Sequence, residues 1–278
     1  MKRKGIIKTL AVISVAIFTT LFTFLLGACG AKSGGEEADE RLTVRIGSDE
    51  YSPFFYRNES GDFAGIDVEL ATEAFKEAFK RIGRKAVFIE IDWSEKNVRL
   101  EKGDVDCLWG CFSMTGREDL YAWAGPYMKS RQVLAVRADS AINTFADLSG
   151  KSIAMQYTSK ADELFTSGKD ERIPELSRIL CFSDFDNIFA ALKNGYADAI
   201  AGHETALKER MKSDMGKYRI LEETLLSVEL GVAFKIGGGE ELAALVSKAL
   251  VVMRNDGFTA SVLKRYGVNP DDVMTGEV

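Results

Sequence analysis

The segment WGCFSMTGRED combines the groups that bind a carboxylate. Ser113 and Thr115 offer hydroxyl groups, Arg117 offers a guanidinium, and Trp109 ends the preceding strand pattern. An arginine binds a carboxylate through two parallel charge-assisted hydrogen bonds, while hydroxyl and N–H groups fill the remaining lone pairs. The alternative interpretation is a polar turn with a solvated arginine. The segment predicts a site for a ligand that bears a carboxylate.

The segment SDEYSPFFY places two carboxylates beside aromatic rings. Asp49 and Glu50 precede Tyr51 and Phe54, on a loop that contains a proline. Aromatic rings stack on planar or aliphatic groups and attract an ammonium through cation–π interaction. The alternative is that these rings belong to the hydrophobic core, which is what we expect for Phe55. The segment is a second candidate ligand loop.

Both loops follow strand patterns within an alternating series of strands and helices. A β-α-β-α-β series favours an open, mainly parallel sheet. A second series of the same plan follows without a proline- or glycine-rich linker, so we expect two α/β lobes joined by continuous strands. The predicted strands are 42–48, 86–91, 105–109, 179–182, 198–202 and 230–235, and helices are predicted from Val68 to Ile82, at 98–103, from near Thr158 or Ser159, at 184–195 and after 235. Residues 58–62 are predicted to close a hairpin.

In such sheets, ligands bind at the carboxyl ends of the strands. The loops at these ends are 48–56, 109–117, 156–160 and 201–204. They include both candidate loops, together with the helix start near Thr158 and the region of the single histidine. We therefore look for the ligand site among these loops.

Residues 1–28 have the plan of an export signal. Residues 1–8 carry four positive charges, and an uncharged apolar run from Thr9 to Gly27 leads to Leu-Gly-Ala-Cys, the form of a lipobox ending at Cys29. An uncleaved membrane anchor is the alternative, because about 20 apolar residues can span a bilayer. We predict a lipoprotein signal peptide at 1–28, lipidation of Cys29, and a flexible tether at 29–40 that holds an extracytoplasmic protein at the membrane.

The composition excludes several classes of protein. With 46% hydrophobic and 28% charged residues in 278, the chain is globular and long enough for one or two domains. Without residues 1–28, 32 basic and 42 acidic residues leave a net charge of −10, the wrong sign for a nucleic-acid binder. One histidine and no C-x-x-C pair predict no metal site, and no cofactor is expected. Cys107, Cys111 and Cys181 allow at most one disulfide.

Several motifs in order resemble one known family. They are YSPFFY, GDFAGIDVELA, GDVDCLW, FSMT-G-R and WAGPYM, followed by LKNGYADAIAG, ELGVAFKIGGGEEL and VVMRNDGFTASVLKRYG. Each motif is weak alone, but together they resemble the family 3 extracellular solute-binding proteins, the receptors of polar amino-acid ABC importers. The resemblance covers nearly all of the chain beyond the tether.

The resemblance implies a periplasmic-binding-protein fold, with two α/β lobes joined by a two-strand hinge that close on a ligand. The chain would cross between lobes near 131–137 and 226–233. Lobe one would be 41–132 plus 231–278, and lobe two would be 133–230. This assigns the C-terminal helices, which periodicity alone left open, to lobe one.

The resemblance also implies the roles of site residues. Asp49 would lie in the ligand loop, and Tyr51 and Phe54 would flank the ligand side chain. Serine, threonine and arginine of the second loop would hold its α-carboxylate, aided by the N-terminus of the helix near Thr158 and Ser159. These carboxylate-binding residues are Ser113, Thr115 and Arg117.

The chain departs from the family pattern at two positions. One residue fewer than usual separates the threonine from Arg117. His203 stands where the family usually has the aspartate that pairs with the α-ammonium, and a neutral imidazole supplies no charge. Glu204, Asp49 or Glu50 could supply the charge instead. The alternative for His203 is a helix-start or surface residue.

Together these features predict a lipid-anchored, monomeric, extracytoplasmic substrate-binding protein of an ABC importer, with a membrane permease as partner and an amino acid or derivative as ligand. Two other classes stay open: a dehydratase-like enzyme on the same fold, and a ligand sensor for a separate signalling protein. An enzyme would need a positioned acid near a leaving hydroxyl, and the segments considered contain no distinct one. We expect no enzymatic activity.

Overall fold

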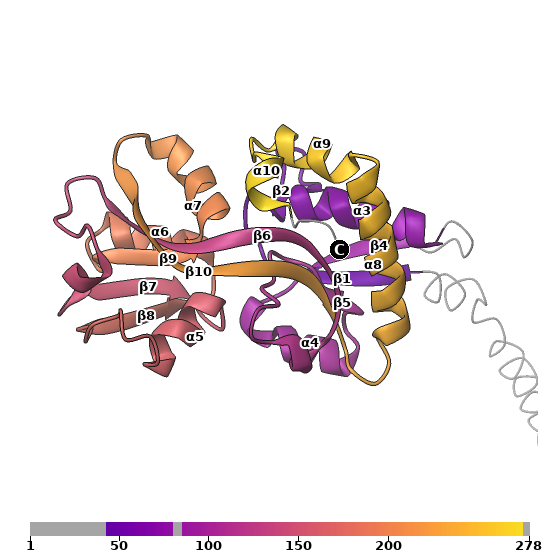
Figure 1. Cartoon of the computed structure of the whole chain (residues 1–278), viewed down its shortest axis with the longest axis horizontal. Helices are drawn as coiled ribbons and strands as arrows, with labels where there is room; N and C mark the ends of the chain where they lie inside the picture. Colours follow the sequence, from indigo (N-terminus) through magenta and orange to yellow (C-terminus); the bar gives the residue numbers. More distant parts are fainter. Residues whose placement is uncertain (1–42, 80–84, 275–278) are drawn as a thin grey trace, which may run out of the picture. The chain divides into compact units, whose positions relative to one another are not determined.

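The computed structural model describes residues 43–79 and 85–274, and Figure 1 shows their arrangement. At the centre is an eight-stranded sheet with the strand order β4-β1-β5-β10-β6-β9-β7-β8. Its strands are β1 (Thr43–Ser48), β4 (Lys85–Glu90), β5 (Cys107–Leu108), β6 (Ala122–Arg137), β7 (Ser152–Gln156), β8 (Arg178–Phe182), β9 (Ala199–His203) and β10 (Tyr218–Phe234). The predicted signal peptide, the tether and the lipidation site Cys29 lie outside the described residues.

The strands of each β-α-β-α-β series pair in parallel, as predicted, and the antiparallel pairs lie between the two series. At its two sides β1 pairs in parallel with β4 and β5, and β7 pairs in parallel with β8 and β9. At the centre β10 pairs antiparallel with β5 and β6, and β6 with β9. The parallel parts are the two series seen in the sequence, and the antiparallel part is the connection between them.

Strands β6 and β10 are the connection between two lobes, and Figure 1 shows them side by side through both. They are 16 and 17 residues long and pair over most of their length. We call β1, β4, β5 and their helices the first lobe, and β7, β8, β9 and their helices the second lobe. The predicted boundaries after residues 132 and 230 fall inside β6 and β10 and stay a prediction.

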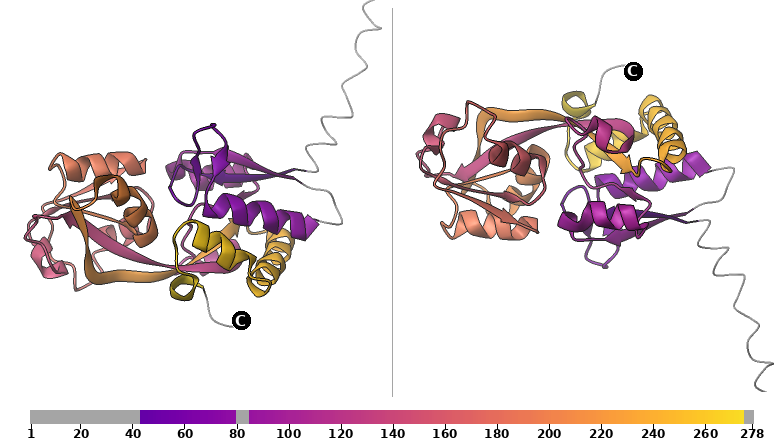
Figure 2. Two further views of the ribbon diagram at one scale, coloured as in Figure 1. Left: turned by 90° about the horizontal axis from the view of Figure 1, so that it is seen from above. Right: turned by 90° about the horizontal axis from the view of Figure 1, so that it is seen from below.

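Helices cover the sheet in both lobes (Figure 2). In the first lobe α3, α8 and α9 pack together, and Gly103, with φ of 73°, ends α4 as predicted. The helices are α3 (Ile66–Phe79), α4 (Lys96–Lys102), α5 (Lys160–Ser167), α6 (Phe185–Lys193), α7 (Glu204–Met211), α8 (Glu240–Asn255), α9 (Phe258–Arg265) and α10 (Pro270–Val273). Short 3₁₀ turns are η1 (Trp93–Glu95), η2 (Glu118–Leu120), η3 (Phe145–Leu148) and η4 (Lys212–Asp214), and the predicted hairpin is β2 (Tyr56–Arg57) with β3 (Phe63–Ala64). Within residues 43–79 and 85–274, no helix has the length and apolarity needed to cross a bilayer.

In the second lobe, helices cover both faces of the sheet because its strands carry apolar side chains on both faces. Side chains alternate between the faces of a strand. Ile153 and Met155 of β7 pack in one core with Phe165 of α5, while Ala154 packs in another core with Ile188 of α6. Figure 2 accordingly shows α5 on one side of these strands and α6 and α7 on the other.

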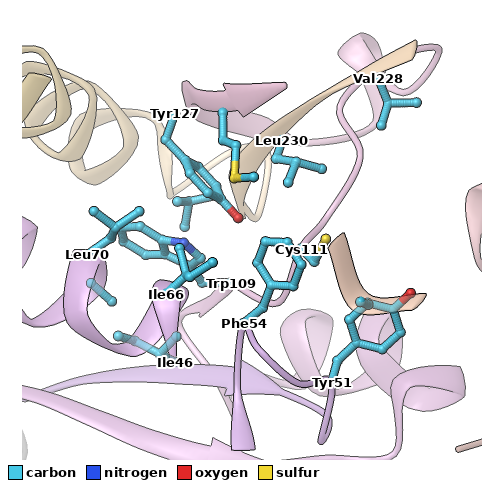
Figure 3. Close-up of a cluster of buried hydrophobic side chains, with 14 of the residues drawn as sticks. Ile46, Tyr51, Phe54, Ile66, Leu70, Trp109, Cys111, Tyr127, Val228 and Leu230 are labelled. Atoms are coloured by element: carbon cyan, nitrogen blue, oxygen red, sulfur yellow. The ribbon is translucent and has the colours of Figure 1, made fainter. Parts of the chain in front are cut away.

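The first lobe buries large aromatic side chains directly behind the ends of β1 and β5. Figure 3 shows Phe54 and Trp109 within a cluster that also contains Ile46, Leu70 and Tyr127. Phe54 and Trp109 are 0% and 1% exposed. This packing fixes the two loops that carry the predicted ligand groups.

Candidate functional site

Six of the ten predicted ligand-binding residues line one cavity, at the carboxyl ends of β1, β5, β7 and β9. The six are Asp49, Tyr51, Ser113, Arg117, Ser159 and His203. They come from both lobes, and the four loops at these strand ends meet around the cavity. The cavity volume is about 30 Å³, which is room for a few water molecules and not for an amino acid. Side chains of the protein itself fill most of the site.

The loop after β1 brings Asp49 and Tyr51 to the cavity. Asp49 is 8% exposed and accepts a hydrogen bond from Nε2 of Gln156 in β7. Burial raises the pKa of Asp49 to about 6, although the hydrogen bond from Gln156 opposes the rise. The Tyr51 hydroxyl accepts a hydrogen bond of 3.3 Å from the backbone N–H of His203, and its ring lies 4.6 Å from that of Phe185. Both residues therefore join the first lobe to the second.

The loop after β5 is held from behind by a buried carboxyl group. Asp67 of α3 accepts a hydrogen bond of 2.7 Å from the backbone N–H of Cys111, and burial raises the pKa of Asp67 to about 7. Cys111 has φ of 51°, which L-residues rarely adopt. Gly110 passes so close to β1 that a Cβ would lie 2.2 Å from Oγ of Ser48. These contacts set the path of the loop that carries Arg117.

Arg117 already binds a carboxylate that belongs to the second lobe. Its side chain is 5% exposed, and its Nε donates a 2.7 Å hydrogen bond to Oε1 of Glu163 in α5, with a second bond from Nη2. The guanidinium also lies 5.1 Å from the ring centre of Phe112. Partial burial would raise the pKa of Glu163, but hydrogen bonds from Lys160 and Arg117 hold it below its usual value. The spacing departure seen in the sequence does not keep Arg117 from the cavity.

The start of α5 uses its own side chains to satisfy its N–H groups. Ser159 caps the helix by accepting from the backbone N–H of Asp162, and Asp162 accepts from the backbone N–H of Thr158. The Thr158 hydroxyl accepts a 2.7 Å hydrogen bond from Nζ of Lys96. The predicted helix start is confirmed, and Ser159 lines the cavity while Thr158 does not.

Lys96 is a cation near the site that the sequence did not indicate. It lies at the start of α4, is 4% exposed, and reaches across to Thr158 of the second lobe. Burial and then the nearby Arg117 lower the pKa of Lys96 to about 8. In sequence it is one of many lysines on helices, and only the packing of the two lobes distinguishes it.

His203 ends β9 and is neutral. The ring is 8% exposed, and its two nitrogens lie 2.9 Å from Nε2 of Gln132 and 2.9 Å from Oγ of Ser130. Burial and then Arg117 lower the pKa of His203 to about 3. Of the alternative interpretation, the helix start is confirmed, because His203 is the residue directly before α7, and the exposed surface position is wrong. Gln132 also lines the cavity, and no motif in the sequence pointed to it.

Two of the three carboxylates considered as substitutes for the missing aspartate are elsewhere. Glu204 pairs with Arg131 and Lys208, and these hydrogen bonds lower its pKa to about 2. Neither Glu204 nor Glu50 lines the cavity, whereas Asp49 does.

Four predicted ligand contacts do not line the cavity. Phe54 and Trp109 are core residues, because their rings fill the space behind the loops. The hydroxyl of Thr115 accepts from the backbone N–H of Glu229 in β10, and that of Thr158 accepts from Lys96. In this arrangement of the lobes, the hydroxyl groups of Thr115 and Thr158 position neighbouring residues.

The three cysteines of the described residues are free thiols. Cys107 and Cys111 are buried, and burial raises the pKa of both. Burial also raises the pKa of Cys181, to about 12. At neutral pH they are protonated and weak nucleophiles. Across residues 43–79 and 85–274, no cluster of histidine, cysteine and carboxylate groups could hold a metal ion.

Residues 44–269 match the family model of bacterial extracellular solute-binding proteins, family 3. The L-cystine-binding protein TcyA of Bacillus subtilis is 27% identical over 270 residues, which are 91% of this chain and 96% of that protein. The histidine-binding periplasmic protein of Salmonella typhimurium is 29% identical over 233 residues, 80% and 86% of the two chains. An ABC uptake transporter substrate-binding protein from Streptococcus pneumoniae, solved with bound histidine, has the same fold, with a TM-score of 0.73, 23% identity, and coverage of 84% and 97%.

Proposed function

The chain belongs to the bacterial extracellular solute-binding proteins, family 3, and from that premise we propose that it binds an amino acid or derivative for an ABC importer. The named relatives bind L-cystine and histidine. One observation carries the proposal: the cavity contains a buried arginine, Arg117, that holds a carboxylate between the two lobes. A ligand carboxylate would replace that of Glu163.

Binding would require the lobes to separate and close again. The cavity of about 30 Å³ is too small for an amino acid, and its groups come from both lobes. Rotation about β6 and β10 would open the site, and the ligand would stabilise the closed form through contacts that exist only when both lobes touch it. The lobe limits near residues 132 and 230 fit this motion, since both lie within the connecting strands.

The delivery part of the proposal rests on the N-terminal sequence. Lipidation of Cys29 would anchor a monomeric protein to the outer face of the cell membrane, with residues 29–40 as the tether that lets it reach a permease. Mass spectrometry of the protein from membranes tests this: an N-terminal diacylglyceryl-cysteine supports the anchor, and an intact residue 1 contradicts it.

Ligand binding is tested by thermal unfolding of the full chain in detergent against amino acids, small peptides and organic acids. A ligand at 100 times its Kd adds about 2.7 kcal/mol to the free energy of unfolding. At least one amino acid should raise the melting temperature, and if none does, the proposal fails. Each stabilising compound should be recovered unchanged after incubation, because its conversion would identify an enzyme instead.

A further inference from the structure

His203 and Gln132 form a buried pair at one side of the cavity. They lie opposite each other in the register of β9 and β6, and their Nε2 atoms are 2.9 Å apart. A neutral imidazole has one N–H, so if Gln132 donates to Nε2, the proton on Nδ1 faces Oγ of Ser130 at 2.9 Å. Both ring nitrogens are then occupied. His203 offers a ligand neither a charge nor a free nitrogen.

Gln132 keeps one amide atom without a partner. Its side chain is 1% exposed and lines the cavity, yet Oε1 accepts no hydrogen bond. In residues 43–79 and 85–274, the other buried side-chain atoms in this condition belong to Asp67, Trp109 and Tyr127, and these residues do not line the cavity. Buried acceptors are nearly always paired, because an unpaired one is costly. An unpaired acceptor in a ligand cavity is suited to a donor that the ligand brings.

One side chain that lines the cavity can supply a negative charge. Asp49 is the carboxylate among its lining residues in the described part of the chain. Lys160 and Arg117 also line the cavity, and their side chains carry only donors. The Ser159 hydroxyl lines it too but already caps α5. An ammonium group has three N–H donors, and an amide oxygen together with a carboxylate supplies acceptors for at least two of them.

We propose that Gln132 recognises the amino group of the ligand, with Oε1 accepting an N–H hydrogen bond while Arg117 binds the carboxylate and Asp49 supplies the negative charge. His203 and Ser130 are positioning residues, because their hydrogen bonds hold the amide with its oxygen unpaired. The proposal rests on the proposed function and specifies its ligand class: compounds with a primary amine and a carboxylate, preferred over the same compounds without the amine.

The test compares amino acids with their desamino analogues by isothermal titration of the full chain in detergent. The probes are L-histidine with imidazolepropionate, L-glutamine with glutaramate, L-arginine with guanidinovalerate, and L-cystine with dithiodipropionate. The unchanged protein should bind at least one amino acid more tightly than its analogue. Gln132→Leu should lower affinity for that amino acid by roughly 10- to 100-fold and leave affinity for its analogue within about threefold.

Two variants separate recognition from packing. Gln132→Glu keeps an acceptor at the same position and adds charge, so it should keep or increase the preference for the amino acid. Ser130→Ala removes a hydrogen bond from the same imidazole without touching Oε1, and should change the preference less than Gln132→Leu.

The outcomes distinguish this proposal from the one on which it rests. If no amino acid binds the unchanged protein, the proposed function fails and this inference fails with it. If amino acids bind and Gln132→Leu keeps the same preference, or weakens both members of a pair equally, Gln132 does not recognise the amine and only this inference is overturned.

Discussion

Two groups of side chains around the cavity, called here the charged end and the neutral end, satisfy their polar atoms in different ways. At one end Arg117 is paired with Glu163, so a charged group is already matched by a charged group of the other lobe. At the other end Gln132, His203 and Ser130 form a neutral network that leaves one oxygen unpaired. A ligand carboxylate must compete with Glu163 for Arg117, whereas a ligand N–H group would give Oε1 of Gln132 the partner that it lacks. The charged end should therefore control affinity, and the neutral end should control which ligands are accepted.

The strongest test of the charged end is Arg117→Ala. Losing a two-point hydrogen bond to a carboxylate should weaken binding of any stabilising amino acid by roughly 100-fold or more, measured by titration calorimetry. Arg99→Ala is the matched control, because Arg99 forms exposed ion pairs with Glu95 and Asp104 outside the cavity. Equal affinity of the Arg117 variant and the control would place the carboxylate site elsewhere.

Asp49→Asn tests a carboxylate of the cavity that belongs to neither of these two groups. Because burial raises the pKa of Asp49 to about 6, the folded state keeps a proton that the unfolded state releases near pH 4. Ionisation of Asp49 should therefore lower the free energy of unfolding, relative to the variant, by about 2 kcal/mol as pH rises from 4 to 7. The opposing effect of His203 is common to both proteins and cancels in the difference.

Urea unfolding at several pH values, without ligand, measures this difference. Asp147→Asn is the control, since hydrogen bonds from Asn143 and Thr144 lower the pKa of Asp147, and the slope should have the opposite sign and lie mainly below pH 4. A pH-independent difference between wild type and Asp49→Asn would show that Asp49 is an ordinary exposed acid. Binding of an ammonium ligand should tighten over the same pH range, as Asp49 ionises.

Tyr51→Phe tests how much the hydrogen bond between Tyr51 and the backbone of His203 stabilises the neutral end. The ring stays against Phe185, but the backbone N–H of His203 loses its acceptor. Urea unfolding should show a loss of about 1–2 kcal/mol. Tyr121→Phe removes a hydroxyl bonded to the exposed Asn97 and should cost less, about 0.5 kcal/mol. Equal losses would mean that the hydrogen bond from the His203 N–H to Tyr51 contributes no more to the free energy of unfolding than the exposed one of Tyr121.

Glu163→Gln should have the smallest effect, in the direction opposite to Arg117→Ala. The side chain of Glu163 is 45% exposed, so its pair with Arg117 is partly screened. Removing its charge should free Arg117 and strengthen binding of a carboxylate ligand by roughly two- to fivefold. Glu95→Gln, which breaks an exposed pair with Arg99, should leave the affinity unchanged. Weaker binding in Glu163→Gln would mean that Glu163 helps to hold the ligand instead of competing with it.

Strands and helices with regular patterns could be predicted from the sequence. The strands predicted at 42–48 and 179–182 and the helix start predicted near Thr158 or Ser159 agree with β1, β8 and α5, because strand and helix-start patterns are local signals. The full length of β6 was not, because AWAGPYMKSRQVLAVR contains a proline and several charged residues that break the alternation. Its pairing with β10 comes from residues about 90 positions away, which no local pattern records.

The site was predictable where residue type is informative. Arginine and serine in a loop after a strand indicated Arg117 and Ser113, and both line the cavity. Aromatic residues were ambiguous: Tyr51 reaches the cavity, while Phe54 belongs to the core. Gln132 could not be predicted, because its role depends on a hydrogen bond to a residue 71 positions later.

Gln132 lies in β6, one of the two strands that run through both lobes. When two lobes rotate about a hinge, the atoms nearest the hinge move least. If the lobes rotate about these strands, a ligand amine at Gln132 would stay in contact over a range of lobe angles. The pair of Arg117 and Glu163 joins a loop of one lobe to α5 of the other, so rotation would separate it. A ligand would then bind first at Gln132, near the axis of rotation, and would bind Arg117 second, as the lobes move. The position of Gln132 in β6 would set this order.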